Sequence, residues 1–385
     1  MRRAFIVGCD TNRYGKMEES AREAMVKLAL DVIYKVGLTP KDIELTIVSN
    51  ALSVTEFQGH VGPLVNNGLG IPEIPSMSIE SACASGSTAF REGYVNVAGG
   101  FCDIVLVVGG EKVSHLDTIT ATSYFAYGAD YWFESTHGVM FPGLYALMAT
   151  SYMEKFGLKE ETLGKVAIKN HKNGAKNPKA HFQKEITMEQ YLSSMMVTSP
   201  LKLYDCCPFS DGASCAIIVS EDALKKYKFS EKIEIVGSAR AGNIYTLQDR
   251  EDPTRIDAAT FAVKKALEQA GISQNQIDFV EVHDCFTIAE IIATEGLGFF
   301  KHGEGGKAVE EGLTELDGKI PVNPSGGLKA KGHPVGATGI GQVVEVFEQL
   351  LGRAGKRQVK IKNGYGMTHN VGATGGSCSV HIFSL

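Results

Sequence analysis

Residues 37–48 read GLTPKDIELTIV, and residues 271–282 read GISQNQIDFVEV. Each stretch follows a segment with helical periodicity, and each is typical of a glycine helix cap, a short turn and a strand. The two glycines lie 234 positions apart, and Ile43 and Val48 have counterparts at the same offset. A chance similarity between two amphipathic helices would not also preserve the turn and the strand register. The chain is therefore predicted to contain two halves built on one plan.

A second structural unit recurs in the same way. A turn of small residues followed by a predicted helix occurs at residues 83–100 and again at residues 336–351. Each half then contains a later strand-like run, at residues 103–108 in the first half and at residues 379–383 in the second. Alternating helices and strands of this kind predict an α/β fold with mixed sheets.

The repeat also predicts the domain organisation. The N-terminal half is expected at residues 1–230 and the C-terminal half at residues 231–385. Residues 115–200 have no counterpart in the second half and are rich in aromatic residues, Met, Asn and Lys. We expect them to form an inserted loop domain that covers the functional face.

Composition excludes several classes of function. The formal net charge is -6, which favours neither nucleic acid nor an anionic membrane as the main partner. No apolar run reaches the ~18 residues of a membrane span, and residues 1–8 are typical of a first strand rather than a signal peptide. The eight cysteines include no CxxC pair, so neither a metal site nor disulfides are expected. We expect a cytoplasmic protein.

Cys83 is the first candidate for chemistry. It lies in SACASGS (residues 81–87), where a strand-like run at residues 74–79 leads into a predicted helix at residues 87–98. A thiol at a helix N-terminus feels the positive end of the dipole, which favours its thiolate. The segment alone gives equal weight to a catalytic nucleophile and to a buried structural cysteine.

Three further motifs have the composition of a site. EVHDCF at residues 281–286 follows a predicted strand, where α/β folds place chemistry. NPSGGLKAKGHPVGATG at residues 323–339 holds a histidine between Gly and Pro, without the order of a phosphate-binding loop. THNVGATGG at residues 368–376 is expected to be a loop that exposes backbone N–H groups to an oxyanion. Their plainer alternatives are a core histidine with a buried cysteine, a loop shaped by Gly and Pro, and a Gly-rich turn.

Together these motifs resemble the thiolase family. The combination of SACASG, CCPFSDGA, HDCF, NPSGG…GHPVGATG and HNVG is most similar to the branch of archaeal thiolases and the thiolase domain of sterol carrier protein 2. The resemblance covers nearly the whole chain. It implies a thiolase fold, with the two α/β halves layered α-β-α-β-α. It also implies cleavage of a 3-oxoacyl-CoA by coenzyme A, or the reverse Claisen condensation, through an acyl-cysteine intermediate. Coenzyme A is then a substrate, and no cofactor is expected.

The resemblance assigns roles residue by residue. Cys83 matches the nucleophile, and His333 of the GHP motif matches its base. Asn370 stands where many thiolases carry a second cysteine, and in this branch Cys285 of HDCF takes over the acid/base role. His283 replaces the family's usual asparagine and is expected to orient a water molecule or to donate to the thioester oxygen.

The expected chemistry explains this set of groups. A thiolate suits the exchange of one thioester for another. A second thiol with a pKa near the working pH can carry the α-proton in both directions. Tetrahedral oxyanions need N–H donors, and the resemblance points to the backbone N–H groups of Cys83 and Gly372.

The aromatic part of the insertion bears on the acyl group. Tyr131, Trp132 and Phe133 belong to an aromatic stretch that either lines the acyl pocket or forms a local core or subunit contact. If they line the pocket, we expect a degradative thiolase for a bulky or aromatic acyl group such as benzoylsuccinyl-CoA. The alternative is an acetyl-CoA acetyltransferase that makes acetoacetyl-CoA.

Partners and rival classes complete the expectations. Lys172 and Lys176 are expected either to meet the phosphates of coenzyme A or to belong to a solvated helix end. The resemblance implies at least a homodimer, and related thiolases often pair with a separate zinc-ribbon/OB-fold protein. The rivals are a related ketoacyl-CoA or 3-hydroxy-3-methylglutaryl-CoA synthase and a non-catalytic acyl-CoA-binding subunit. Cys285 favours a thiolase over a decarboxylating synthase, which needs no second thiol.

Overall fold

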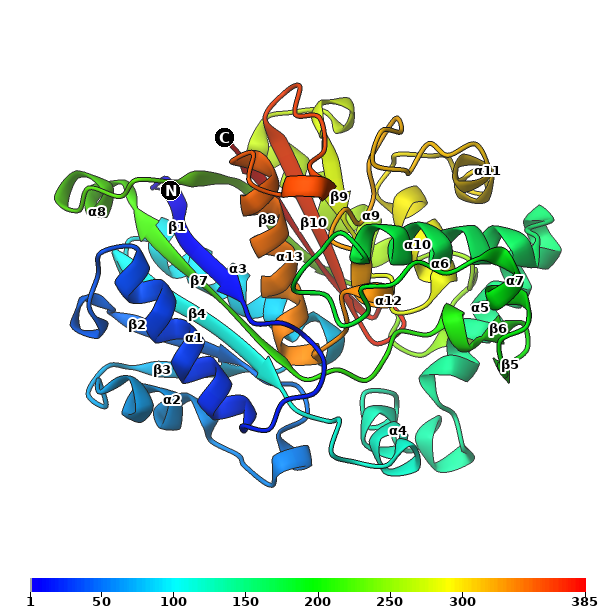
Figure 1. Cartoon of the computed structure of the whole chain (residues 1–385), viewed down its shortest axis with the longest axis horizontal. Helices are drawn as coiled ribbons and strands as arrows, with labels where there is room; N and C mark the ends of the chain where they lie inside the picture. Colours follow the sequence, from blue (N-terminus) through cyan, green and yellow to red (C-terminus); the bar gives the residue numbers. More distant parts are fainter. Residues whose placement is uncertain (1) are drawn as a thin grey trace.

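The computed structural model describes residues 2–385, and its centre is a mixed sheet of nine strands (Figure 1). Across the sheet the order is β3 (Ser76–Ile79), β2 (Leu45–Ser49), β4 (Ile104–Glu111), β7 (Gly212–Ser220), β1 (Ala4–Thr11), β8 (Ile233–Gly242), β11 (Ser377–Ser384), β10 (Tyr365–Gly372) and β9 (Phe279–Glu281). A separate ribbon pairs β5 (Met196–Thr198) with β6 (Leu201–Lys202). Within residues 2–385, no helix combines the length and the apolar character needed to cross a membrane.

The strand directions confirm the predicted duplication. In the first half, β7 is antiparallel to both β1 and β4, and β2 is parallel to β4 and β3. In the second half, β11 is antiparallel to both β8 and β10, and β9 is parallel to β10. A parallel bridge between Val280 and Val322 takes the place beside β9 that β3 takes beside β2. The halves join where β1 pairs with β8.

One expected pairing is wrong. Residues 104–108 of the predicted run belong to β4, whose counterpart is β10, whereas residues 379–383 lie in β11, the counterpart of β7. The sequence also predicts a loop over residues 368–376, but β10 continues to Gly372 and only the following turn is irregular. This strand is hard to recognise because its buried side chains include Thr, His and Asn, whereas a sequence pattern marks buried strand positions by apolar residues.

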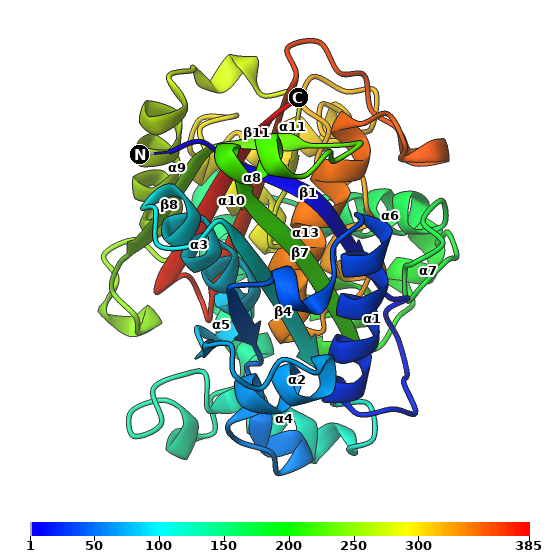
Figure 2. The ribbon, with the colours of Figure 1, turned by 90° about the vertical axis from the view of Figure 1, so that its left-hand side faces the viewer.

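Helices form three layers around the two parts of the sheet (Figures 1 and 2). On the outer side of the first half lie α1 (Ala21–Lys35) and α2 (Val61–Leu69), and α9 (Asp257–Ala270) covers β8 and β11 in the second half. Between the halves, α3 (Ser85–Ala98) packs against α13 (Val335–Leu350). A separate hydrophobic core fills each of these interfaces, which gives the expected α-β-α-β-α layering.

The helix ends follow from local sequence. The Ser20 hydroxyl and the Glu23 carboxylate form a capping box that starts α1. The two glycines of the repeated stretch both lie in the left-handed region, with φ of 81° at Gly37 and 68° at Gly271. Glycine adopts this conformation without steric cost, so it ends each helix and turns the chain into the next strand.

Glycines also explain how the two central helices meet. A Cβ on Gly86 of α3 would lie 2.9 Å from the carbonyl oxygen of Gly336, and a Cβ on Gly339 of α13 would lie 2.2 Å from the backbone nitrogen of Ser87. The GATGIG run therefore serves close helix packing rather than phosphate binding. Because these helices begin next to Cys83 and His333, their contact brings the two candidate residues together.

The segment predicted as an insertion forms a helical layer beside the second half. It contains α4 (Thr118–Ala126), α5 (Phe141–Phe156), α6 (Glu160–Gly174) and α7 (Met188–Leu192). Of these, α5 and α6 pack on α10 (Thr287–Gly296), and α6 also contacts α11 (Gly305–Glu310) and α12 (Gly327–Ala330). By contrast, α4 projects at the lower edge of the molecule in both views (Figures 1 and 2). The short α8 (Glu221–Lys226) follows β7.

Candidate active site

Cys83 lies in a short 3-10 turn, one residue before the N-cap of α3. Ala82 in this turn has φ of 46°, a left-handed conformation that is strained for a residue with a Cβ. The Ser85 hydroxyl fixes the turn, because it donates to the Ala82 carbonyl at 2.6 Å and accepts from the backbone N–H of Ser81 at 2.9 Å. The structure therefore places the thiol at the start of the helix, as the sequence predicts.

The thiol of Cys83 is neutral in the substrate-free site. Burial raises the pKa of Cys83 to about 12, although hydrogen bonds from the backbone of Ala373 and of Cys83 itself favour the thiolate. At this thiol, lost solvation opposes the effect of the helix dipole. The thiol must therefore pass its proton to a base as it reacts.

His333 has the geometry of that base. Its Nδ1 lies 2.7 Å from the hydroxyl of Thr338, which lies 2.9 Å from the carbonyl oxygen of Pro334. A carbonyl can only accept, so the hydroxyl donates to Pro334 and accepts from the Nδ1–H of His333. Nε2 then carries a free lone pair, and it is buried without a hydrogen-bond partner. Burial lowers the pKa of His333 to about 3, which keeps the ring neutral.

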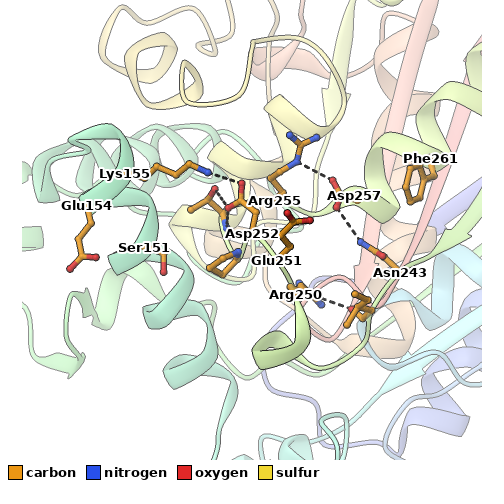
Figure 3. Close-up of a pocket in the computed structure, with 13 residues that line it drawn as sticks. Ser151, Glu154, Lys155, Asn243, Arg250, Glu251, Asp252, Arg255, Asp257 and Phe261 are labelled. Atoms are coloured by element: carbon orange, nitrogen blue, oxygen red, sulfur yellow. Dashed lines mark hydrogen bonds and ion pairs between the residues drawn. The ribbon is translucent and has the colours of Figure 1, made fainter.

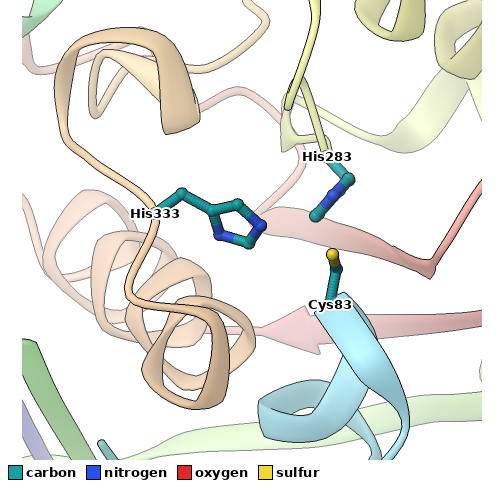
Figure 4. A group of neighbouring side chains, drawn as sticks. All are labelled: Cys83, His283 and His333. Carbon is teal, nitrogen blue, oxygen red and sulfur yellow. The ribbon is translucent and has the colours of Figure 1, made fainter. Parts of the chain in front are cut away.

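Cys83, His283 and His333 converge from three distant segments (Figure 4). The sulfur and one nitrogen of each ring all lie within 4.8 Å of one another. The two imidazoles have their centroids 5.1 Å apart and stand at 79° to each other. His283 is fully buried and its Nε2 has no partner, while burial lowers its pKa well below the ordinary value. Two neutral imidazoles therefore present unpartnered nitrogens to one thiol.

Cys285 supplies a second thiol to the same cavity. The backbone N–H of Cys207 donates to the carbonyl of Cys285 at 3.0 Å and fixes the chain there. Burial raises the pKa of Cys285 well above that of an ordinary thiol, and the neighbouring thiols of Cys207 and Cys83 add to the rise. The expected pKa near the working pH is therefore not a property of the substrate-free site, because the second thiol is also buried and neutral.

Tyr145 of α5 connects this thiol to the opposite wall. Its hydroxyl donates its one proton to the carbonyl of Ala373 at 3.0 Å, so toward the neighbouring thiol of Cys285 it can only accept. The Tyr145 ring is fully buried and stacks on Phe286, with centroids 4.6 Å apart. One side chain thus fixes both the second thiol and the turn that faces Cys83.

The turn after Gly372 offers a further candidate oxyanion donor beside the predicted one. Gly372 ends β10 opposite Ser377 and is absent from the residues that line the catalytic cavity within the described chain. A Cβ at Gly372 would lie 2.7 Å from the carbonyl oxygen of Ser81, so glycine lets the strand approach the nucleophile turn. The next residue, Ala373, lines the cavity, and its backbone lowers the pKa of the Cys83 thiol. The geometry therefore favours Ala373, together with the backbone of Cys83, as the donor pair.

Buried carboxylates hold the loops that carry the histidines. Glu281 accepts from the backbone N–H of Ser325 at 2.9 Å and from its hydroxyl at 2.6 Å. Asp284 of the HDCF motif accepts from the backbone N–H of Leu328 at 2.7 Å. Gly327 has φ of 57°, and a Cβ there would lie 2.2 Å from the Asp284 carboxylate. Asp284 is thus a structural anchor between the HDCF loop and α12.

The catalytic cavity has a volume of about 370 Å³ and is mainly apolar. Its wall consists of both thiols, His333, Ala373 and the following residues: Thr118, Thr122, Phe125, Phe141, Pro142, Tyr145, Met195, Val197, Leu203, Cys206, Cys207, Pro208, Phe209 and Phe286. Phe125 and Phe209 stack with their centroids 5.2 Å apart. Among the residues described, this wall contains no Lys or Arg.

The predicted substrate-binding aromatics are not part of this wall. Tyr131 is 48% exposed, and Trp132 and Phe133 are each 73% exposed. Tyr131 packs edge-to-face on Trp132 and on Tyr127, in the segment after α4, which projects from the body of the molecule (Figure 1). The aromatic lining comes instead from α4, α5 and the residues beside the two thiols. Of the aromatic stretch that favoured a bulky acyl group, Phe125 lines the cavity, whereas Tyr131, Trp132 and Phe133 do not.

The predicted cations also lie away from the cavity. Lys172 forms an ion pair with Glu315 at 3.1 Å, and Lys176 lies just beyond the end of α6. Their neighbour Lys169 is buried and paired with Glu290 at 2.8 Å. Neither Lys172 nor Lys176 lines the catalytic cavity.

A larger and more polar cavity of about 1040 Å³ lies between α5 and the segment before α9 (Figure 3). Its cations already have partners: Lys155 pairs with Asp252 at 2.7 Å, and Arg255 pairs with Asp257 at 3.0 Å. Arg250 donates to the carbonyl and the hydroxyl of Thr374, at 2.7 and 2.9 Å. Thr374 follows Ala373, so Arg250 holds the turn that borders the catalytic cavity. The cations named here are therefore already engaged by other groups of the protein.

Sequence reasoning missed three residues of the site. Tyr145 lies in the apolar run FPGLYALM, where nothing marks its hydroxyl as functional. Ala373 is an ordinary residue whose role comes from the backbone. Cys207 belongs to the CCPFSDGA motif, but no role followed from it until the structure brought it beside Cys285. Of the three, only Cys207 could have been found from the sequence, because it belongs to a motif.

Comparison with known proteins agrees with this geometry. The profile described as "Thiolase, N-terminal domain" matches residues 5–222, and "Thiolase C-terminal domain-like" matches residues 239–385. Over the full length of both chains, the sequence is 44% identical to an acetyl-CoA acetyltransferase of Methanothermobacter thermautotrophicus. It is 32% identical to human sterol carrier protein 2, covering all of this chain and 72% of that protein.

Two more distant matches bear on substrate and fold. Identity to the benzoylsuccinyl-CoA thiolase subunit BbsB of Thauera aromatica is 31%, over 98% of this chain and 96% of that protein. Among solved structures, the Ltp2-ChsH2(DUF35) aldolase superposes with a TM-score of 0.83 at 22% identity, over 99% and 97% of the two chains, which reflects a shared fold. The motifs, the fold and the family profiles agree, and the chain belongs to the thiolase family of CoA-dependent acyltransferases.

Proposed function

We propose that this thiolase is an acetyl-CoA acetyltransferase, which joins two molecules of acetyl-CoA to acetoacetyl-CoA or cleaves acetoacetyl-CoA with coenzyme A. The observation that carries the proposal is the convergence of two thiols, Cys83 and Cys285, on one cavity beside His333. The full-length similarity to an acetyl-CoA acetyltransferase supports acetyl as the transferred group. The bulky-acyl alternative has weaker support, since BbsB is less similar and the exposed aromatics lie outside the cavity.

The first half-reaction acylates Cys83. The thiol attacks the thioester carbonyl of acetyl-CoA as His333 Nε2 takes its proton, so a neutral pair becomes charged only within the reacting complex. The carbonyl oxygen becomes an oxyanion that N–H donors stabilise. When the tetrahedral intermediate collapses, the C–S bond to coenzyme A breaks, and His333 returns the proton to the departing thiolate.

The second half-reaction forms the carbon–carbon bond. Cys285 acts as the base in its thiolate form, which it reaches by losing its own proton to solvent when substrate binds. This thiolate removes an α-proton from a second acetyl-CoA, and the resulting carbanion attacks the acetyl carbonyl on Cys83. Expulsion of the Cys83 thiolate gives acetoacetyl-CoA, and the proton held by Cys285 restores the thiol. A thiolase needs this second thiol, whereas a decarboxylating synthase generates its carbanion by loss of CO2.

An acylation assay tests the nucleophile. Incubation with acetyl-CoA should add one acetyl group to the intact wild-type protein, measured by mass spectrometry, and none to a Cys83→Ala variant. A wild-type protein that stays unmodified would exclude the covalent route and would favour a non-catalytic acyl-CoA-binding subunit.

A thiolysis assay tests the acyl group. With coenzyme A present, acetoacetyl-CoA should be cleaved with a higher kcat/KM than an aryl 3-oxoacyl-CoA such as benzoylsuccinyl-CoA. The reverse order would reinstate the bulky-acyl reading. Turnover of malonyl thioesters without thiolysis would instead point to a synthase.

We propose that a partner protein supplies groups that bind the phosphates of coenzyme A. Coenzyme A carries phosphates, yet the described wall of the catalytic cavity contains no Lys or Arg. We therefore propose that a separate zinc-ribbon/OB-fold protein completes the coenzyme A site, a pairing for which the aldolase with its DUF35 component gives precedent. Thiolysis with and without a candidate partner tests this, and an unchanged KM for coenzyme A would contradict it. Neutralising Lys172 and Lys176 together tests, in the same assay, whether these lysines contact the phosphates of coenzyme A. An unchanged KM for coenzyme A would exclude that contact.

Self-association is also proposed. The strand β3 forms an edge of the sheet, and Met77 on it is 37% exposed. An unpaired edge strand is a ready surface for pairing with a second copy. Light scattering of the purified protein should give at least the mass of a dimer.

A further inference from the structure

A buried chain of hydrogen bonds leads from the backbone to the ring of His283. The side-chain nitrogen of Gln342 donates to the carbonyl of His369 at 3.2 Å. The side-chain nitrogen of Asn370 lies 3.2 Å from the Gln342 side-chain oxygen and 3.2 Å from Nδ1 of His283. All of these residues are 0–2% exposed, so water does not compete for these contacts. The chain therefore determines which groups can donate and which must accept.

The direction of the chain is fixed at its backbone end. The carbonyl of His369 can only accept, so Gln342 must turn its NH2 group toward it and its oxygen toward Asn370. Asn370 must then point its own NH2 group at that oxygen, and the same NH2 group faces Nδ1 of His283. Turning the Asn370 amide over would bring two oxygens together. Turning both amides over would set the Gln342 oxygen against the His369 carbonyl oxygen.

It follows that Nδ1 of His283 accepts and that its proton lies on Nε2. The ring is neutral because burial lowers its pKa, so it carries one proton only. His333 has the opposite arrangement, since Thr338 accepts from its Nδ1–H and leaves Nε2 with a lone pair. The two unpartnered Nε2 atoms beside Cys83 are thus chemically different: one is a donor and the other is an acceptor.

We propose that Gln342 and Asn370 are positioning residues that hold His283 as a hydrogen-bond donor toward the substrate carbonyl, leaving His333 as the only base for Cys83. The proposal rests on the proposed function for what the donor binds, namely the thioester oxygen as it becomes negative. Asn370 thereby has a role of its own, where many thiolases carry a cysteine. The Nε2–H also occupies the lone pair that a zinc ion would need, so the sulfur and two imidazoles do not form a ready three-ligand metal site.

Asn370→Asp reverses the direction of the hydrogen bond at Nδ1 of His283. A carboxylate has no N–H, so it accepts from Nδ1–H and moves the proton of the neutral ring off Nε2. The donor then survives only in the imidazolium form, which the carboxylate stabilises at low pH. The other titratable groups that face the ring, His333, His369 and Cys83, are neutral and do not replace this effect.

Two measurements test the proposal on the intact protein. In 15N NMR of histidine-labelled protein, with the His283 signal assigned by its loss in His283→Asn, wild-type His283 should show protonated Nε2 and bare Nδ1. Asn370→Asp should show the reverse at alkaline pH. Loss of one oxyanion donor reduces kcat by about 10²–10³-fold, so acylation by this variant should fall as pH rises through the new imidazole pKa. The rate of acylation by the wild-type protein should not fall in this pH range.

Two further variants separate positioning from folding. His283→Asn supplies an amide donor that has no tautomer, so adding Asn370→Asp to it should cost much less than in wild type and should produce no new pH limb. Gln342→Leu should weaken the tautomer preference, whereas Gln349→Leu removes another buried glutamine of α13 that contacts Glu345 and the Arg357 carbonyl instead. Gln349→Leu should leave the His283 signal unchanged.

A wild-type spectrum with bare Nε2 would overturn the proposal, and so would equal losses from Asn370→Asp in both backgrounds. The NMR result does not depend on turnover. An inactive protein with the expected tautomer would therefore count against the proposed function alone, and an active thiolase with the opposite tautomer would count against the positioning role alone.

Discussion

The resting state of Cys83 can be tested through its reaction with iodoacetamide between pH 6 and pH 9. A thiol with a pKa of about 12 is ionised to roughly one part in 10⁵ at pH 7, and its alkylation should rise about tenfold for each pH unit. No plateau should appear within this range, because the titration midpoint lies above it. His333 stays neutral throughout, since its pKa is lowered to about 3.

The expected magnitude follows from two opposing effects. Relative to an ordinary thiol of pKa 9.0, the thiolate fraction at pH 7 is about 10³-fold smaller. A more basic thiolate is more nucleophilic, and a Brønsted coefficient of about 0.4–0.5 returns roughly 20-fold over three pKa units. The folded protein should therefore react about 50-fold more slowly at Cys83 than the same chain in denaturant, before any effect of restricted access.

The assay must isolate one thiol among eight. Peptide mass spectrometry of the Cys83 fragment does this, since Cys102, Cys206 and Cys207 are also partly accessible. A rate that levels off below pH 8, or that exceeds the rate of the denatured chain at pH 7, would refute the neutral resting thiol. It would instead support a thiolate already present before substrate binds.

Three other outcomes are expected. Cys285→Ser should keep acylation by acetyl-CoA within a few-fold while condensation falls by about 10²–10⁴-fold; equal losses in both half-reactions would contradict the division of labour. Lys169→Met should lower the free energy of unfolding by about 3–5 kcal/mol in urea titrations, because it removes the cation that is paired with Glu290 in the interior; an unchanged midpoint would mean that the pair contributes nothing. Below pH 6.5 the protein should lose stability by roughly 1–3 kcal/mol per pH unit, since more groups gain a proton on unfolding than lose one. Chemical denaturation at pH 6.5 and pH 5 checks this sign, and greater stability at pH 5 would refute it. The groups that gain a proton on unfolding are the histidines with a lowered pKa, namely His171, His181, His283, His333, His369 and His381. The groups that lose one are the carboxyls with a raised pKa, namely Glu111, Asp205, Glu281 and Asp284.

The sequence predicted those parts of the site that depend on residue type and local motif. Cys83, His333, Cys285 and His283 were identified from short motifs, and the structure brings all four to the same region. The substrate-binding predictions had no such support. Tyr131, Trp132 and Phe133 were selected for their composition alone, and a run of aromatic residues gives no information about the direction in which an irregular segment projects.

The proton states could not be predicted from sequence. A helix N-terminus favours a thiolate, and that local rule is correct in itself, but the pKa of Cys83 depends on how completely other segments exclude water. The same holds for the oxyanion donor. The family pattern points to Gly372, whereas Ala373 is the residue of this turn that lines the cavity, and which backbone N–H faces the site depends on where β10 ends.

By itself the sequence predicted the duplication and the α/β architecture, because glycine caps and hydrophobic periodicity are local properties, and its resemblance to the thiolase family pointed to the four reactive side chains. Only the tertiary structure decided which imidazole accepts a proton and which donates one. That difference depends on Thr338, Asn370 and Gln342, whose hydrogen bonds run between segments far apart in the chain and begin at backbone carbonyls. Proton positions in a buried site are a property of the whole network, and the network exists only once the two halves have packed together.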